Sequence, residues 1–187
     1  MPMCPFVNNT YPFEIKLRAN ILPMLSKFSS EIGRIWYTLY MNILIISPGK
    51  KHSPEMAALI GEYEKRLGGR FDVSWKFIPA GDIKDECAAI LKALQPDDFV
   101  ILLDEKGSAV TSVQFSKMLE PSAVSSSKRI VFVIGGAYGV DDSVRSRARK
   151  TVSLSAMTLP HMIVRLLLVE QIYRASEIIR GGKYHHA

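Results

Sequence analysis

From Met41 onward, short apolar runs alternate along the chain with segments that have helical periodicity. Two of the runs, DFVILLDE and RIVFVIGG, are almost continuously apolar, which is typical of strands buried on both faces of a parallel sheet. Strands that alternate with helices predict an α/β fold, in which a mainly parallel sheet is covered by helices on both faces. The predicted strands are NILIIS (42–47), FDVSWKFIP (71–79), DFVILLDE (98–105), RIVFVIGG (129–136) and VSLSAM (152–157).

Local signals at helix ends define the segments between these strands. Ser53 and Pro54 suit the N-cap and the first turn of a helix that Gly68 would end in a left-handed conformation. Thr111 and Gln114 have the spacing of a capping box, in which each side chain bonds to the backbone of the other residue. The predicted helices are 54–67, 82–94, 112–120, 141–150 and 160–180.

Residues 1–40 differ in character from the rest of the chain. They contain scattered prolines and no sustained period of a strand or a helix. We therefore expect one domain of residues 41–187 after a leader of residues 1–40, which is either disordered or the product of a misassigned start, with translation beginning at Met41. A targeting presequence is the alternative, because basic residues outnumber acidic ones in the leader. We expect a cytoplasmic protein, with import into an organelle as the second possibility.

Composition and charge fit a single globular domain with an anionic partner. The chain has 187 residues, 48% of them hydrophobic, with a formal net charge of +6 and a pI of about 9.3. A basic balance favours nucleic acid, phosphate or an acidic membrane surface. Cys4 and Cys87 lie far apart, so neither a disulfide framework nor a zinc site is expected. No apolar stretch is long enough to predict a membrane span.

Three segments that follow predicted strands are candidate binding loops: LDEKGS (103–108), IGGAYGVDD (134–142) and LSAMTLPH (154–161). Ligands of parallel sheets bind beyond the carboxyl ends of the strands, where these loops would lie. The glycine-rich segment matches neither GxGxxG nor GxxxxGK. Its glycines either let a ligand approach the backbone or form only a turn in which Asp141 caps a helix. His161 is either structural or takes a direct part in the chemistry.

The last predicted helix is apolar on nearly all sides, which argues for burial by more than one partner. We expect part of it to form a homodimer interface, with Leu168 on the outward face. Arg165 and Arg174 are nine residues apart and should emerge on opposite faces. Glu170 precedes Arg174 by one turn and could hold its guanidinium as an i,i+4 pair. The apolar positions that cannot all face one core are Ile163, Leu166, Leu167, Val169, Ile172 and Ile179.

Two polar segments allow two interpretations each. RSRARK (145–150) contains Arg145, Arg147, Arg149 and Lys150, which could contact phosphate or form a solvated face. The terminal GGKYHHA is either an exposed chain end or a part of an active site.

Taken together, LLDEKG, FVIGGAYGV, LSAMTLPHMIVRLLLVEQIYRA and the terminal YHH resemble the RlmH family, small SPOUT methyltransferases that act on a pseudouridine of large-subunit ribosomal RNA. The resemblance runs from Met41 to His186. It implies a SPOUT-type α/β fold whose C-terminal segment forms a trefoil knot, a homodimer, and S-adenosyl-L-methionine as the cofactor without any metal. Nothing in the hydrophobic pattern predicts a knot.

The resemblance also implies which residues act. Tyr184 or His185 would accept or orient the proton on the target nitrogen, and Arg174 would bind RNA phosphate or stabilise negative charge on the base. The implied cofactor contacts are Leu103, Gly135, Leu154, Ser155, Ala156, Met157, Thr158 and Leu159.

The implied reaction is methylation of N3 of a pseudouridine in 23S ribosomal RNA, at position 1915. The partners would be a second copy of the chain and large-subunit RNA within the assembled ribosome. A catalytically silent protein of the same fold that only binds RNA or the ribosome is the alternative. A generic nucleotide-binding enzyme is less favoured, because the chain has no phosphate-loop motif.

Overall fold

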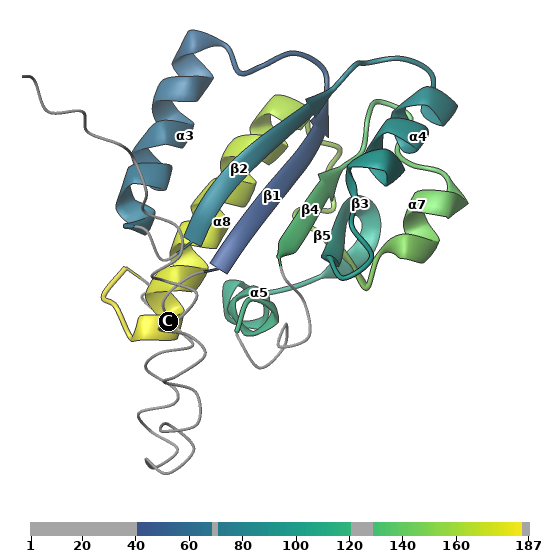
Figure 1. Cartoon of the computed structure of the whole chain (residues 1–187). Coiled ribbons are helices and arrows are strands. Elements are labelled where there is room, and N and C mark those ends of the chain that lie inside the picture. The colour runs from purple at the N-terminus through teal and green to yellow at the C-terminus, as the bar shows by residue number, and fades with distance from the viewer. Residues whose placement is uncertain (1–40, 69–70, 121–128, 185–187) are drawn as a thin grey trace, which may run out of the picture. The chain divides into compact units, whose positions relative to one another are not determined.

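A five-stranded sheet forms the centre of the fold, and every pair of neighbouring strands in it is parallel (Figure 1). The computed structural model describes residues 41–68, 71–120 and 129–184. The expectations about the leader and about His185 fall outside these residues. In spatial order the strands are β2 (Phe71–Ile78), β1 (Met41–Pro48), β4 (Ile130–Ile134), β3 (Phe99–Ala109) and β5 (Lys150–Ser153).

Helices cover both faces of this sheet, as the alternating pattern predicts. Phe115, Leu168 and Ile172 join Ile43 and Ile45 of β1 in one apolar core. Cys87, Ile90 and Val144 pack with Ile46 and Val133 in a second core on the opposite face. The first core therefore lies under α3 (Pro54–Leu67), α5 (Ser112–Met118) and α8 (His161–Arg180), and the second under α4 (Ile83–Ala93) and α7 (Asp142–Arg147).

The predicted helix caps are confirmed, although α5 and α7 end at Met118 and Arg147 and not at residues 120 and 150 as predicted. The Ser53 side chain accepts a hydrogen bond from the Met56 backbone, and Gly68 ends α3 with a φ of 61°. Thr111 and Gln114 form the capping box at the start of α5. These caps satisfy backbone groups that a helix end otherwise leaves without partners.

The orientation of α8 corrects one expectation. Leu168 is fully buried between α8 and the sheet, so its predicted place on an outward face is wrong. Val169 and Ile172 are buried in the same core, because a helix that lies along a sheet buries a wide stripe. Only Ile163 and Leu167, with 40% and 37% of their surface exposed, remain as large apolar side chains on the outer side.

Two strand boundaries differ from the sequence prediction. β5 begins at Lys150 and ends at Ser153, so most of the predicted strand VSLSAM is a loop. β3 continues to Ala109, but both Leu103 and Ser108 pair with Val152 of β5. Residues 104–107 therefore form a bulge within β3, which we call the β3 excursion. The sequence predicts a loop after the strand at this position.

Among the described residues, no helix combines the length and the apolar character needed to cross a membrane.

The burial of Leu168 leads to a stability prediction. Leu168→Ala should lower the free energy of unfolding by about 3 kcal/mol, because it removes apolar contacts and leaves a cavity in the core. The control variant Leu59→Ala removes the same atoms from α3, where Leu59 is 47% exposed, and should cost less than about 1 kcal/mol. Urea unfolding of both variants measures the difference, and equal losses would contradict the observed orientation of α8.

Candidate functional site

The three candidate loops meet at one cavity of about 660 Å³. They follow or interrupt β3, β4 and β5, so the cavity lies at the carboxyl edge of the sheet. His161 and Val164, from the first turn of α8, complete its wall. The predicted cofactor residues that line the cavity are Leu103, Gly135, Leu154, Ser155, Met157, Thr158 and Leu159, while Ala156 is outside the lining.

The excursion in β3 is held at both of its ends. The Asp104 carboxylate accepts a hydrogen bond from the backbone of Lys106 at 2.8 Å and forms an ion pair with Arg145 of α7 at 2.6 Å. A Cβ atom on Gly107 would lie only 2.6–2.9 Å from backbone atoms of Val152 and Ser153. Glycine is therefore required where the excursion returns to β5.

The glycine-rich loop is a tight turn against a buried carboxylate. Gly139 donates its N–H to the carbonyl oxygen of Gly136 at 3.0 Å and has a φ of 73°. A Cβ atom on Gly136 would clash with the carboxylate of Glu86 on α4, which also accepts a hydrogen bond from the Gly81 backbone. Asp141 caps α7, so the turn both ends at a helix cap and lines the cavity.

The third loop is ordered by its own hydroxyl groups. The Ser153 hydroxyl donates to the Ser155 carbonyl at 2.7 Å, and the Ser155 hydroxyl accepts from the Met157 backbone at 2.9 Å. Thr158 donates to Glu105 at 3.0 Å and so joins this loop to the β3 excursion. The cavity therefore has walls that are fixed before any ligand binds.

The chemical character of the cavity suits an organic ligand. Leu103, Ile134, Leu154, Leu159 and Val164 supply apolar wall, and polar groups from the loops lie around them. Small-molecule sites commonly combine apolar walls with a few placed polar groups in volumes of roughly 300–1,000 Å³. In the described part of the chain no cluster of His, Cys, Asp and Glu side chains could hold a metal ion.

A second polar cluster lies at the C-terminal end of α8. Arg174 donates two hydrogen bonds to one carboxylate oxygen of Glu170, at 2.6 and 3.0 Å, which confirms the predicted i,i+4 pair. After the helix ends at Gly181, Tyr184 folds back and its hydroxyl donates to the same oxygen at 3.3 Å. The Arg174 guanidinium lies over the Tyr184 ring, 4.8 Å from its centre.

This environment changes the acidity of Tyr184. Burial is the largest cause that raises the pKa of its phenol, and the negative charge of Glu170 raises it further, while Arg174 opposes the shift. The phenol is therefore neutral near physiological pH and acts in this arrangement as a hydrogen-bond donor.

The cavity and the C-terminal cluster are separate within one chain. Neither Arg174 nor Tyr184 lines the cavity. Val164 and Arg174 are ten residues apart on α8, which corresponds to about 15 Å along the helix axis. The fold thus brings the predicted cofactor residues together at the cavity, and it brings Arg174 and Tyr184 together at the C-terminal end of α8. Within one chain these two groups do not meet.

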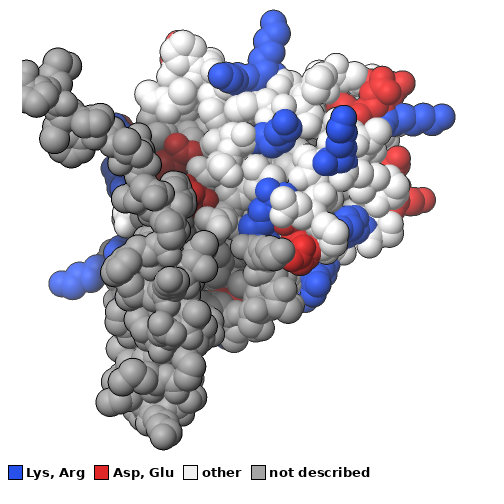
Figure 2. All heavy atoms as spheres, in the orientation of Figure 1, with Lys and Arg blue, Asp and Glu red and all other residues white. Residues whose placement is uncertain are grey.

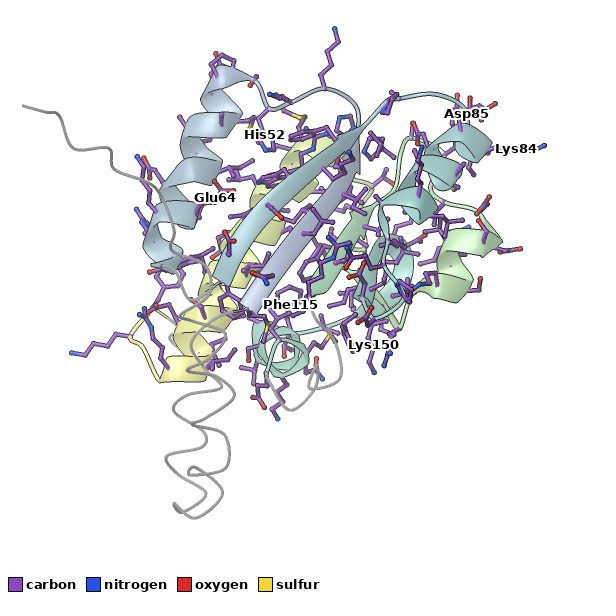
Figure 3. The ribbon with its side chains drawn as sticks, in the orientation of Figure 1. His52, Glu64, Lys84, Asp85, Phe115 and Lys150 are labelled. Atoms are coloured by element: carbon purple, nitrogen blue, oxygen red, sulfur yellow. The ribbon has the colours of Figure 1, made fainter. Side chains whose placement is uncertain are left out.

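The four basic residues of RSRARK differ in their contacts within the chain. Arg145 is paired with Asp104, and Arg147 donates to backbone carbonyls in the segment 95–98. Arg149 lies over the ring of Phe99. Lys150, labelled in Figure 3, remains exposed at the start of β5.

The sequence analysis missed the structural importance of Arg165. This side chain is fully buried and donates to the Pro48 carbonyl at 2.7 Å and the Ser47 hydroxyl at 2.9 Å. It thereby joins the end of β1 to the start of α8. The available signal was a single arginine inside the apolar run MIVRLLLV.

Comparison with known proteins identifies similar sequences over most of the chain. Residues 41–185 match the model of a family described as predicted SPOUT methyltransferase. A protein of Parabacteroides distasonis named ribosomal RNA large subunit methyltransferase H is 42% identical over 158 residues, covering 78% of this chain and 99% of the relative. A Prochlorococcus marinus protein of the same name is 43% identical over 141 residues, covering 75% of this chain and 90% of the relative.

Solved structures show a more distant likeness. The SpoU methyltransferase AviRb from Streptomyces viridochromogenes, solved in complex with AdoMet, has a TM-score of 0.41 and 17% sequence identity. The match covers 78% of this chain and 62% of AviRb, so this chain spans less than two thirds of that structure.

The electrostatics of the C-terminal cluster can be tested directly. Glu170→Gln should lower the pKa of Tyr184, because it removes a negative charge that disfavours the phenolate. Ultraviolet difference titration against the same background carrying Tyr184→Phe isolates this one tyrosine. Glu62→Gln, which removes an exposed carboxylate on α3, is the matched control and should leave the pKa of Tyr184 in place. An unchanged Tyr184 pKa in Glu170→Gln would contradict the assigned cause.

Proposed function

Since the chain belongs to the SPOUT methyltransferase family, we propose that it is an S-adenosyl-L-methionine-dependent methyltransferase of large-subunit ribosomal RNA. The observation that carries this proposal is the single cavity formed by the three loops at the carboxyl edge of the sheet. All of these loops lie within the residues that match the family. The names of the similar proteins support ribosomal RNA as the substrate.

The cavity residues fit the proposed cofactor. Its volume of about 660 Å³ is sufficient for a ligand of this size. Leu103, Leu154 and Leu159 would hold the cofactor by apolar contacts, and Gly135 would offer its backbone. When bound, S-adenosyl-L-methionine supplies a methyl group on a positively charged sulfur. The chain itself must therefore orient the acceptor and deal with the acceptor's proton.

We propose N3 of a pseudouridine, at position 1915 of the large-subunit RNA, as the acceptor. This nitrogen carries a proton that must leave before or during transfer, so a proton acceptor and an aligned geometry are both needed. Tyr184 is poorly suited to accept it because its pKa is raised, but its hydroxyl can orient the base by a hydrogen bond. We assign the proton to the imidazole of His185, because histidine is the side chain whose unperturbed pKa, about 6.5, suits proton transfer near neutral pH.

Arg174 has the second role in this proposal. Its pKa is raised chiefly by hydrogen bonds to Glu170, so the guanidinium stays positively charged at every physiological pH. Placed beside the target base, it would stabilise negative charge that develops when N3 loses its proton, or hold a neighbouring phosphate.

The separation along α8 supports a homodimer with composite sites. Because Arg174 and Tyr184 lie about 15 Å along the helix from the cavity of their own chain, we propose that they act at the cavity of a second copy. The exposed apolar side chains of Ile163 and Leu167, close to the cavity end of α8, are suited to burial in that contact. We include the trefoil knot of the SPOUT fold in the same proposal.

The proposed substrate is RNA within the assembled ribosome, and we place the enzyme in the cytoplasm. The family match accounts for residues 41–185, which leaves no second described domain for RNA recognition. The alternative, a catalytically silent protein that binds RNA or the ribosome, would have no use for a cofactor cavity. Isothermal titration with S-adenosyl-L-methionine separates the two, because a silent protein should show no binding.

Methyl transfer tests the proposal at the level of the product. Assembled ribosomes from a strain that lacks this gene should gain one methyl group on the proposed pseudouridine when the protein and the cofactor are added. Mass mapping of the RNA, with and without complementation of the strain, identifies the nucleotide. Methylation elsewhere would reject the assigned position but keep the proposed enzyme class.

Arg174→Ala tests the role of this arginine in methyl transfer. It should lower kcat for methyl transfer by roughly 100-fold or more, which is the usual effect of removing one group that stabilises developing charge. Cofactor affinity should stay within about twofold, because Arg174 does not line the cavity. Lys92→Ala, which removes an exposed cation from α4, is the matched control and should leave both quantities unchanged. Full activity of Arg174→Ala would exclude the role assigned to this residue.

A further inference from the structure

The buried guanidinium of Arg165 has no acidic partner among the described residues. Its hydrogen bonds go to neutral acceptors, which are the Ser47 hydroxyl, the carbonyls of Pro48 and Lys50, and the Met162 sulfur. Burial alone lowers its pKa, with no opposing carboxylate. A buried charge normally has a counter-charge close by. The region around Arg165 therefore carries an excess of positive charge.

Arg165 also fixes the shape of the loop between β1 and α3. Its hydrogen bonds reach the carbonyl oxygens of Pro48 and Lys50, at 2.7 and 3.1 Å. Gly49 donates its own N–H to the carbonyl of Ile78 at 2.9 Å. At the other end of the loop, the His52 ring packs edge-on against the Trp75 ring of β2, with the ring centres 4.5 Å apart. Figure 3 shows His52 between α3 and β2. We call residues 49–52 the basic loop, because its two lysines are exposed on this fixed backbone.

The basic loop lies next to the cavity. A Cβ atom on Gly49 would be 3.8 Å both from Nε2 of His161 and from the Arg165 guanidinium. His161 lines the cavity and begins α8, whose N-terminus has no side-chain cap. The positive end of the helix dipole thus adds to the charge of Arg165 at this point. Glu86 is the acidic residue that acts on His161, and it faces the glycine-rich turn.

The lysines of the basic loop are outside the cavity lining. Lys50, Lys51 and Arg165 do not contribute to the wall, whereas His161 does. The positive charges of Lys50 and Lys51 therefore lie beside the proposed cofactor site and are exposed to solvent. At the same edge, Lys106 is also exposed and lines the cavity, whereas Arg145 is paired with Asp104. Figure 2 shows Lys and Arg at separate points of the visible face and not in one patch.

We propose that the basic loop binds a backbone phosphate of the RNA substrate, next to the cavity in which the base is methylated. Lys50 and Lys51 would contact the phosphate oxygens. Arg165 would fix the loop conformation through its hydrogen bonds to the carbonyls of Pro48 and Lys50, and its buried positive charge would attract the phosphate. A loop that is rigid before binding loses little entropy when it meets a phosphate. This inference rests on the proposed function. It places the RNA backbone on the basic loop, outside the cavity that would hold the cofactor.

The test is the double variant Lys50→Gln, Lys51→Gln, which removes both charges and keeps long polar side chains. Its control, Lys84→Gln with Lys92→Gln, removes two exposed charges from α4, where Figure 3 shows Lys84 pointing away from the sheet. Binding of a fluorescein-labelled single-stranded RNA is measured by anisotropy over a series of KCl concentrations. Each lost phosphate contact should reduce the slope of log K against log [KCl] by about 0.7.

The expected result is a slope smaller by about 0.7 in the basic-loop variant, which loses its one phosphate contact, and an unchanged slope in the α4 variant. With assembled ribosomes as substrate, KM should rise on the order of tenfold in the basic-loop variant while kcat stays within about twofold. An equal change in both variants, or no change in either, would overturn the proposal.

Titration with S-adenosyl-L-methionine distinguishes the remaining outcomes. Unchanged cofactor affinity in the basic-loop variant supports the proposal. Loss of cofactor binding with the RNA slope retained would overturn it, because the loop would then serve the carboxylate of the cofactor. If the wild-type protein binds RNA but no cofactor, the proposed methyltransferase function fails, while the comparison of slopes still decides whether the basic loop contacts phosphate.

Discussion

The guanidinium of Arg165 connects the end of β1 with the second turn of α8, and the arrangement of the cavity depends on this contact. It donates hydrogen bonds to Ser47 and Pro48 on one strand and to Lys50 in the following loop. Because α8 is anchored at this point, the loop before it is held against the β3 excursion and the glycine-rich turn. Burying a charge among neutral acceptors costs stability, so the contact is better understood as fixing geometry than as strengthening the fold.

Close approach of backbone segments is the second constraint on the site. Gly107 allows β3 to return to β5, and Gly135 leaves room for the backbone of Gly139, which would lie 3.2 Å from a Cβ atom there. Side-chain bonds complete the frame, including the ion pair of Asp104 with Arg145 and the bond from Thr158 to Glu105. The walls of the cavity are therefore built from three loops that restrain one another, which is the preorganisation that a binding site for a small molecule requires.

The sequence predicts the fold better than it predicts the orientation of its parts. Buried strands and helix caps depend on local patterns, so β4 and the capping box at Thr111 were predictable. The face of α8 that meets the sheet was not, because the helix is apolar on nearly every side and gives Leu168 no directional signal. The polar letters of DEKG predicted a loop after β3, whereas pairing with β5 resumes beyond them. Arg165 was passed over because its partners are backbone oxygens distant in sequence.

The double pairing of Val152 with Leu103 and with Ser108 separates the contacts of the excursion from the pairing of the sheet. Four residues leave the strand and return to the same partner, so their side chains are not needed to hold β5 in register. Asp104 and Glu105 can therefore bond to Arg145 and Thr158 at the cavity wall. The same strand thus carries the sheet and one wall of the binding site, with different residues for each task.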